Sequence, residues 1–524
     1  MNNKSKYHII GGGIAGLATA VYLIQEGKIK GEQISIYEKA KKIGGSLDAK
    51  DSNKVKGYTM RGIRAFEKST YTAYMDLLGR IPTNNNKTLK DIFLDYNKEK
   101  KVYFPGRLTK NKEIIDSKEL KISILDKEKF SKLIITKEEK IENRKINDYF
   151  SEEFFCSNFW YEFCTLFAFK KDDSLIEMKR YLLRFLNSFK YIDTLEVLQI
   201  TPLNQYEFLI LPIEKYLKEN GVNIQEEVKI IDIEFEKTYN KKAIKKIYLT
   251  KNDKDKVINL GNNDYVFITI GSMTASSSIG DMNNPPKKKT EKLSLSWSLW
   301  ENIVKNNPEY GKPEVFTNNI KNTGWTSFTI TFKDSVIRDL LKQYIKGDHT
   351  AFTGTTFIDS NWFITLLFHL EKYFKNQEDD TLIAWGYTLN PQNNGNYINK
   401  KIEDCNGKEI LEEIIHHFGL ENYRNKILET TICIPDYTPY VTSQFIATKK
   451  GDTPPVVPEN SLNFAFIGQF VDMKDDIVFT VEYSVRTAQK AVYELLGIEK
   501  KVTEIPEFKN NPKVLYNAFK TLIR

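Results

Sequence analysis

Histidine and cysteine are scarce in this sequence: its 524 residues include five histidines and four cysteines. No two of these residues have the spacing of a zinc ligand pair, so we predict no metal site. The cysteines form no CxxC pair, which is typical of reduced thiols inside the cell. A GxSxG nucleophile motif is also absent, and this makes serine-hydrolase chemistry a poor hypothesis.

Long apolar runs are missing as well. The segment closest to such a run, 154–169, is interrupted by Asn158 and Glu162. A membrane-spanning helix needs about 20 apolar residues. The chain starts with polar residues that lead directly into a predicted strand, which argues against a signal peptide. We therefore expect a cytoplasmic protein.

Neither sign of charge dominates. The 77 Lys and Arg residues exceed the 69 Asp and Glu residues by eight, and the excess is spread along the chain. Such a distribution gives no basic patch, so we predict no nucleic-acid partner, although an anionic membrane surface would attract the protein. The length predicts about two to four domains.

A glycine-rich segment follows the first predicted strand, 7–10. It has the GxGxxG pattern, and the apolar spacing of a helix continues over 17–26. Strand, glycine turn and helix in this order form the phosphate-binding turn of a Rossmann-like fold. The helix N-terminus supplies free N–H groups for a pyrophosphate. The expected cofactor contacts here are Gly11, Gly13, Ala15 and Gly16.

A second predicted strand, 34–37, ends at Glu38. An acid at this position accepts hydrogen bonds from the ribose hydroxyls, which favours an unphosphorylated ribose over NADP. Gly44, Gly45 and Ser46 follow shortly afterwards, and a glycine pair such as Gly44-Gly45 at this distance is typical of FAD enzymes. We therefore predict FAD as the cofactor.

Later segments complete the predicted FAD domain. Residues 264–270 and 463–468 have the composition of buried strands, and 481–496 has that of a helix. The N-terminus of this helix, directed at the isoalloxazine, would stabilise negative charge on a reduced flavin. The cofactor contacts expected in these segments are Gly271, Ser272, Gly468 and Thr480.

These signals predict an α/β fold: a discontinuous Rossmann-like FAD-binding domain, an inserted α+β substrate domain and a helical C-terminal region. The FAD domain would comprise residues 1–75, 205–285 and 460–498, the substrate domain 76–204 and 286–459, and the tail 499–524.

Two segments leave alternatives open. The aromatic segment 154–169 is either a buried helix or the wall of an apolar channel for a fatty acyl chain. The tail is either a docked helix or a basic amphipathic helix on a membrane surface. Its apolar residues are expected on roughly one helical face, with Lys513 and Lys520 beside it. They are Val514, Leu515, Phe519, Leu522 and Ile523.

Long segments of the sequence resemble the oleate hydratases, also called the myosin-cross-reactive antigen family. The resemblance extends from about residue 7 to residue 496. It is carried by GGGIAGLATAVYLI, YEKAKKIGGSLD, GYTMRGIR, EEFFCSNFW, EMKRYLLRF, LNQYEFLILP, FITIGSMTASSSIGD, SWSLW, GDTPPVVPENSLNFAFIGQF and FTVEYSVRTAQKAVYELLG.

This family binds FAD, which is most effective when reduced. It adds water to the cis double bond of free unsaturated fatty acids, giving hydroxy fatty acids without net redox change. The resemblance therefore implies a FAD-dependent hydro-lyase for oleate- or linoleate-type acids. It also implies a homodimer that works at the membrane surface.

The resemblance assigns roles to individual residues. In EMKRY, Tyr181 matches the catalytic tyrosine, which donates a proton to the alkene. A phenol with its ordinary pKa near 10 is protonated at neutral pH and able to donate. The expected substrate contacts are Gln205, Tyr206, Thr431 and Thr442. The loop expected at the flavin is Arg61, Gly62, Ile63 and Arg64.

One departure from the family concerns the residue that activates the attacking water. The family's loop reads RGGRE, and its Glu is taken to activate the attacking water, whereas this chain has Ala65 at that position. Glu67 is the candidate replacement. A flavin-dependent double-bond isomerase, which needs a proton shuttle but no positioned water, is one alternative. A catalytically impaired fatty-acid-binding flavoprotein is another.

Overall fold

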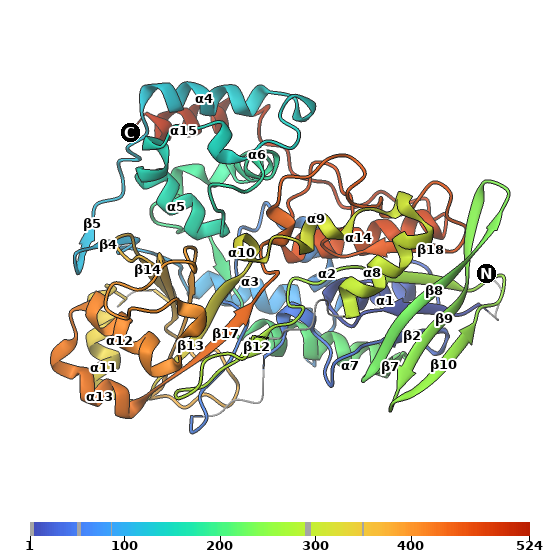
Figure 1. Ribbon diagram of the computed structural model, residues 1–524, viewed down its shortest axis with the longest axis horizontal. Coiled ribbons are helices and arrows are strands. Elements are labelled where there is room, and N and C mark those ends of the chain that lie inside the picture. The colour runs from blue at the N-terminus through green and yellow to red at the C-terminus, as the bar shows by residue number, and fades with distance from the viewer. Residues whose placement is uncertain (1–4, 50–53, 85, 289–294, 348–349, 524) are drawn as a thin grey trace.

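The structure is a computed structural model that describes residues 5–49, 54–84, 86–288, 295–347 and 350–523. Arg524, the last residue of the predicted tail, lies outside this part. The predicted α/β class is confirmed, because helices accompany both a parallel sheet and a large, mostly antiparallel sheet (Figure 1).

The first lobe is built on a parallel sheet of five strands in the order β18-β11-β1-β2-β7. Four of the five strands are almost entirely buried, as expected for a parallel sheet with both faces covered. The strands are β1 (Tyr7–Ile10), β2 (Ile34–Tyr37), β7 (Asn223–Gln225), β11 (Tyr265–Thr269) and β18 (Phe464–Ile467).

Two helices of this lobe pack on each other, α1 (Ile14–Gln25) and α14 (Val481–Leu495). The predicted order of strand, glycine turn and helix is confirmed, with α1 beginning three residues earlier than expected. Three further helices of this part of the chain are α2 (Thr72–Arg80), α3 (Leu89–Glu99) and α7 (Leu211–Glu219).

An antiparallel sheet of three long strands adjoins the parallel sheet (Figure 1). It consists of β8 (Val228–Thr238), β9 (Lys241–Lys251) and β10 (Lys254–Asn259). Helix α8 (Leu295–Asn306) packs on β8, although its residues fall in the segment predicted for the substrate domain. The exact division of the chain into domains stays a prediction.

The second lobe contains an eight-stranded sheet in the order β12-β17-β13-β16-β15-β14-β4-β5. Alternate residues of its central strands, such as Phe328 and Leu366, pack in a core with helices α11 to α13. The residues between them face the opposite side, as the two-residue period of a strand requires. The strands are β12 (Ser278–Ile279), β17 (Thr431–Thr438), β13 (Trp325–Phe332), β16 (Leu382–Thr388), β15 (Ile364–His369), β14 (Phe352–Phe357), β4 (Leu108–Lys110) and β5 (Glu113–Ile115). The helices are α11 (Ser335–Tyr344), α12 (Gly407–Phe418) and α13 (Arg424–Thr430).

A helical group covers one end of the molecule (Figure 1). It is formed by α4 (Ile124–Ile135), α5 (Asn158–Phe167), α6 (Leu175–Arg184) and α15 (Pro512–Leu522). The hydroxyls of Ser157 and Ser174 cap α5 and α6 by accepting backbone N–H bonds. Short elements complete the fold: β3 (Ala65–Phe66), β6 (Gln199–Ile200), α9 (Pro313–Thr317) and α10 (Ile320–Thr323). No helix within the described residues is long and apolar enough to cross a bilayer.

The C-terminal helix buries only part of its predicted apolar face. Val514 and Leu522 are buried where α15 packs on residues 186–191. Leu515, Phe519 and Ile523 instead remain 40%, 60% and 56% exposed. The helix therefore docks along one side of its apolar stripe and leaves the other side on the surface.

Candidate active site

The dinucleotide turn connects β1 to α1. A Cβ added to Gly16 would lie 2.0 Å from the backbone oxygen of Gly11, so only glycine permits this approach of helix and strand. A Cβ on Gly13 would meet nothing closer than the Cα of Gly45, at 3.9 Å. Because the N-terminus of α1 has no side-chain cap, its backbone N–H groups stay available to an anion.

Glu38 lies directly beside this turn, at the end of β2. Its carboxylate accepts hydrogen bonds from the N–H groups of Gly12 and Ala40, both at 2.8 Å, and the side chain is 8% exposed. A buried carboxylate fixed in this way fits the predicted contact with ribose hydroxyls. Ala15 is buried in the first turn of α1.

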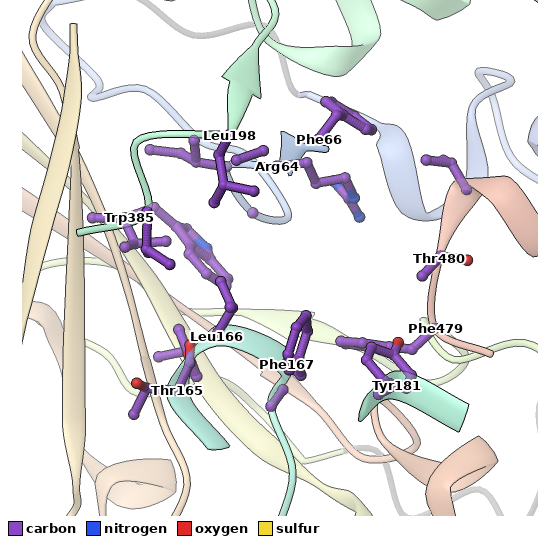
Figure 2. A pocket seen from close by; sticks show the side chains of 18 of the residues that line it. Arg64, Phe66, Thr165, Leu166, Phe167, Tyr181, Leu198, Trp385, Phe479 and Thr480 are labelled. Atoms are coloured by element: carbon purple, nitrogen blue, oxygen red, sulfur yellow. The ribbon is translucent and has the colours of Figure 1, made fainter. Parts of the chain in front are cut away.

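A cavity of about 270 Å³ extends from the dinucleotide turn into the second lobe. At the turn it is lined by Ile14 and Ser46, and farther on by aromatic residues of α5 and α6. Residues of the large sheet, including Trp385, line another side (Figure 2). Helix α5 thus combines both alternatives for the aromatic segment, since it is buried and also forms part of an apolar wall.

Tyr181 lines this cavity and is 2% exposed. Its hydroxyl donates a hydrogen bond of 2.6 Å to the carbonyl oxygen of Val478. Its ring lies 4.8 Å from that of Phe167, between centroids (Figure 2). The ring of Phe169 lies 5.1 Å from it. Burial raises the pKa of Tyr181 well above its ordinary value, so the phenol holds its proton at neutral pH.

A network of buried charges fixes the loop that carries Val478. Asp476 pairs with Arg184, at 2.7 Å, and with Arg486. Burial alone would raise the pKa of Asp476, but the two guanidinium groups hold it below its ordinary value. Arg184 belongs to the same helix as Tyr181, so α6 carries the phenol and also holds the loop that accepts its hydrogen bond.

The predicted flavin loop lies at the cavity. Arg61, Gly62, Ile63 and Arg64 all line it. Arg61 binds Asp48 at 2.6 Å and Asp436 at 3.1 Å, and Arg64 donates to the carbonyl oxygen of Ser46 at 3.1 Å.

Four other predicted cofactor residues stand beside the cavity or at its edge. Thr480 lines the cavity and caps α14 by accepting the N–H of Tyr483. Gly271, Ser272 and Gly468 follow β11 and β18 and do not line the cavity. Their sequence neighbours Met273, Thr274 and Gln469 do line it.

Glu67 does not line the cavity, whereas Ala65 does. The carboxylate of Glu67 instead accepts hydrogen bonds from the Ser69 N–H at 3.2 Å, from the Ser69 hydroxyl and from the Thr70 hydroxyl. This placement argues against Glu67 as the acid that activates water. Among the described residues that line the cavity, Asp436 is the one carboxylate. Its position within an otherwise uncharged strand, TICIPDYT, is the sequence signal that could have identified it.

The predicted substrate contacts are dispersed. Thr431 pairs with Phe332 at the start of β17, and the Thr442 hydroxyl donates to the Thr323 carbonyl oxygen. Neither lines the cavity, although Thr438 and Val441 do. The pairing of Thr431 and Thr442 with a carboxylate in this cavity is therefore not supported.

Gln205 and Tyr206 lie outside the lining as well. The ring of Tyr206 lies beside Gly44, next to the dinucleotide turn. Gln205 is 2% exposed and donates to the Thr201 hydroxyl at 2.8 Å. Its Oε1 atom, the hydroxyl of Tyr373 and Nε2 of His369 are buried without a hydrogen-bond partner among the described residues. Sequence reasoning found only Gln205 of these three.

A family model described as the MCRA family matches residues 4–493. The chain belongs to the MCRA family. It is 36% identical over 518 residues to an oleate hydratase of Streptococcus pyogenes serotype M49 (strain NZ131), which covers 96% of this chain and 87% of that protein. It is 30% identical over 563 residues to a linoleate hydratase of Lactiplantibacillus plantarum, covering 99% and 98% of the two chains. The resemblance predicted from the sequence is confirmed.

Two solved structures have a fold similar to that of this MCRA-family chain. A putrescine oxidase matches with a TM-score of 0.54 at 10% identity, covering 94% of this chain and 99% of that one. An oxidoreductase from Methanosarcina mazei matches with a TM-score of 0.51 at 13% identity, covering 93% and 100%. At such low identity these likenesses establish the fold alone.

Proposed function

We propose that this protein is a FAD-dependent fatty acid hydratase. It would add water to a cis double bond of a free unsaturated fatty acid of the oleate or linoleate type, giving a hydroxy fatty acid. The observation that carries the proposal is the protonated phenol of Tyr181 in an apolar cavity that continues to a dinucleotide turn. The relationship to an oleate hydratase and a linoleate hydratase supports the same substrate class.

FAD fits the residues at the turn end of the cavity. The residues Gly11 to Gly16 would hold the pyrophosphate, since no side chain occupies the space at Gly13. Glu38 would bind the ribose, and the loop 61–64 with Thr480 would face the isoalloxazine. Reduced flavin would supply an electron-rich ring that supports the site without net electron transfer.

The addition itself needs little from the protein besides proton placement. The Tyr181 hydroxyl transfers its proton to one alkene carbon, so a C–H bond forms as the π bond breaks. Water forms a C–O bond with the neighbouring carbon and releases a proton. The aromatic walls at Phe167 and Phe185 keep other water away from the cationic carbon.

We place the substrate carboxylate at the buried hydroxyl of Tyr373, whose ring stacks on that of His369 at 4.2 Å between centroids. A donor buried without a partner costs about 1–3 kcal/mol, and the Tyr373 hydroxyl is such a donor, so a carboxylate that accepts its hydrogen bond would offset part of this cost. His369 lies two residues from Leu367, which lines the cavity, and therefore on the same face of β15.

Incubation of the protein with FAD, a reductant and oleate or linoleate in H₂¹⁸O is expected to give a hydroxy acid that carries ¹⁸O. Methyl oleate should react far more slowly because it lacks the carboxylate. Absence of any labelled hydroxy acid would contradict the proposal. In D₂O, an isomeric alkene containing deuterium would instead identify an isomerase, and ligand binding without turnover an impaired enzyme.

We propose further that α15 brings the protein to a membrane surface. Leu515, Tyr516, Phe519 and Ile523 form an exposed apolar stripe, and Lys513 and Lys520 belong to the same helix. Apolar side chains next to basic ones favour an anionic bilayer surface. A homodimer stays a prediction from the family resemblance.

The double variant Phe519→Asp, Ile523→Asp is expected to bind phosphatidylglycerol vesicles about tenfold or more weakly in a flotation assay, because two apolar side chains are lost from the contact. Tyr239→Asp is the matched control, since Tyr239 is 94% exposed and lies between β8 and β9, away from the helical group. Equal vesicle binding by the double variant and the control would refute the membrane role of α15.

A further inference from the structure

Water that adds to an alkene must lose a proton, and this step calls for an acceptor within reach of the cavity. The chain has alanine at position 65, and the neighbouring acid Glu67 is bound to Ser69 and Thr70 outside the cavity. Glu162 is fully buried and does not line the cavity either. Asp436 is the carboxylate that remains among the described lining residues.

Asp436 is held rigidly at this position. It belongs to β17, where its backbone is paired with that of Ser327 on β13 and of Ile279 on β12. Its side chain is 10% exposed, and one carboxylate oxygen binds Nη1 of Arg61 at 3.1 Å. Thr438, two residues along the strand, lines the same cavity, as expected for residues on one face of a strand.

The carboxylate faces the loop that lacks an acid. Arg61 belongs to the loop that continues to Ala65, and Arg61, Ala65 and Asp436 all line the one cavity. A carboxylate contributed by β17 therefore borders the cavity that Ala65 also borders, and it does so from the second lobe.

We propose that Asp436 is the catalytic carboxylate that orients the attacking water and accepts its proton. The inference rests on the proposed hydratase function. As Tyr181 protonates one alkene carbon, the water oxygen bonds to the other carbon and one water proton passes to a carboxylate oxygen of Asp436. The proton then returns through solvent to the phenolate of Tyr181, so the cycle closes without an oxidant or reductant.

The ion pair with Arg61 is compatible with this role. A guanidinium beside a carboxylate weakens it as a base. However, water that bonds to a cationic carbon becomes an oxonium group, which is far more acidic than water. An oriented carboxylate is then sufficient as the proton acceptor, and the hydrogen bond from Arg61 supplies the orientation.

The test compares Asp436→Asn with the unaltered holoenzyme, using oleate in H₂¹⁸O and in D₂O. We expect ¹⁸O incorporation to fall about 10²- to 10⁴-fold, the loss typical of a general base. Deuterium exchange into the alkene should persist, because Tyr181 still donates and the cation can lose a proton again. A purely structural defect would lower both signals together. Asp48→Asn is the matched control, since it removes the other carboxylate bound to Arg61 and should keep ¹⁸O incorporation within about tenfold.

Two further variants keep the proposal falsifiable if Asp436→Asn binds FAD poorly. Asp436→Ala with added formate should regain part of the ¹⁸O incorporation, and Ala65→Glu combined with Asp436→Asn should restore it from the other side of the cavity. The proposal is overturned if Asp436→Asn keeps full ¹⁸O incorporation, or if neither formate nor the glutamate restores it. No ¹⁸O incorporation by the unaltered enzyme would instead refute the hydratase function itself.

Discussion

The Tyr181→Phe variant is expected to lose about 10²- to 10⁴-fold in kcat for hydration while its affinity for FAD changes little. The substitution removes one oxygen atom and keeps the ring that packs against Phe167 and Phe169. Without the hydroxyl, the proton donor that we assign to the addition is lost. Both ¹⁸O incorporation and deuterium exchange into the alkene should therefore disappear, which distinguishes this variant from Asp436→Asn.

Tyr483→Phe is the matched control for this experiment. The Tyr483 hydroxyl is also buried and donates to a backbone carbonyl, that of Val471 at 2.5 Å, but Tyr483 does not line the cavity. Each lost hydrogen bond should cost about 0.5–1.5 kcal/mol of folding stability, and Tyr483→Phe should cost more than Tyr181→Phe because the Tyr483 hydroxyl also accepts the N–H of Met473 at 3.0 Å. Only Tyr181→Phe should lose turnover. If it retains more than a tenth of the activity, the proton comes from another group.

The predicted nucleotide end of the site rests on local signals in the sequence. The turn 11–16 depends on contacts between residues a few positions apart, such as Gly16 against Gly11, and this spacing is visible in the sequence. Glu38 can be predicted for the same reason, because it follows a short buried strand and lies next to the turn.

Contacts between distant segments could not be predicted in this way. Glu67 lies two residues from Ala65, so an extended strand would have placed both on one face. Strand β3 ends at Phe66, however, and the chain turns between Glu67 and Thr70, which directs the carboxylate into the turn. Asp436 reaches the cavity only because the eight-stranded sheet faces the flavin loop, across 375 residues of chain.

The tail illustrates the same limit. Helical spacing groups Val514, Leu515, Phe519, Leu522 and Ile523 into a broad stripe, but it does not say how far around the helix a partner extends. Packing on residues 186–191 covers one side of the stripe. The exposed part of the stripe is the surface that we propose contacts a membrane.

Gly16→Ala is expected to abolish FAD binding and to destabilise the first lobe. The added Cβ would lie 2.0 Å from the backbone oxygen of Gly11 and 3.1 Å from Ile9, and the backbone oxygen cannot rotate away as a side chain can. Helix α1 must then shift from β1, which moves the N–H groups of its first turn out of the phosphate position. Overpacking of this kind costs about 1–3 kcal/mol or more. Flavin absorbance of the purified protein and the thermal unfolding midpoint measure the two effects.

Gly13→Ala and Gly79→Ala separate these effects. A Cβ on Gly13 has only Gly45 near it, at 3.9 Å, so the protein should fold normally and bind FAD more weakly, because the methyl group enters the space assigned to the pyrophosphate. A Cβ on Gly79, in helix α2, meets only the Lys90 side chain at 3.6 Å, so both flavin content and stability should be kept or slightly improved. If Gly16→Ala holds FAD and unfolds at the same temperature as Gly79→Ala, the close contact between α1 and β1 is not what shapes the cofactor site.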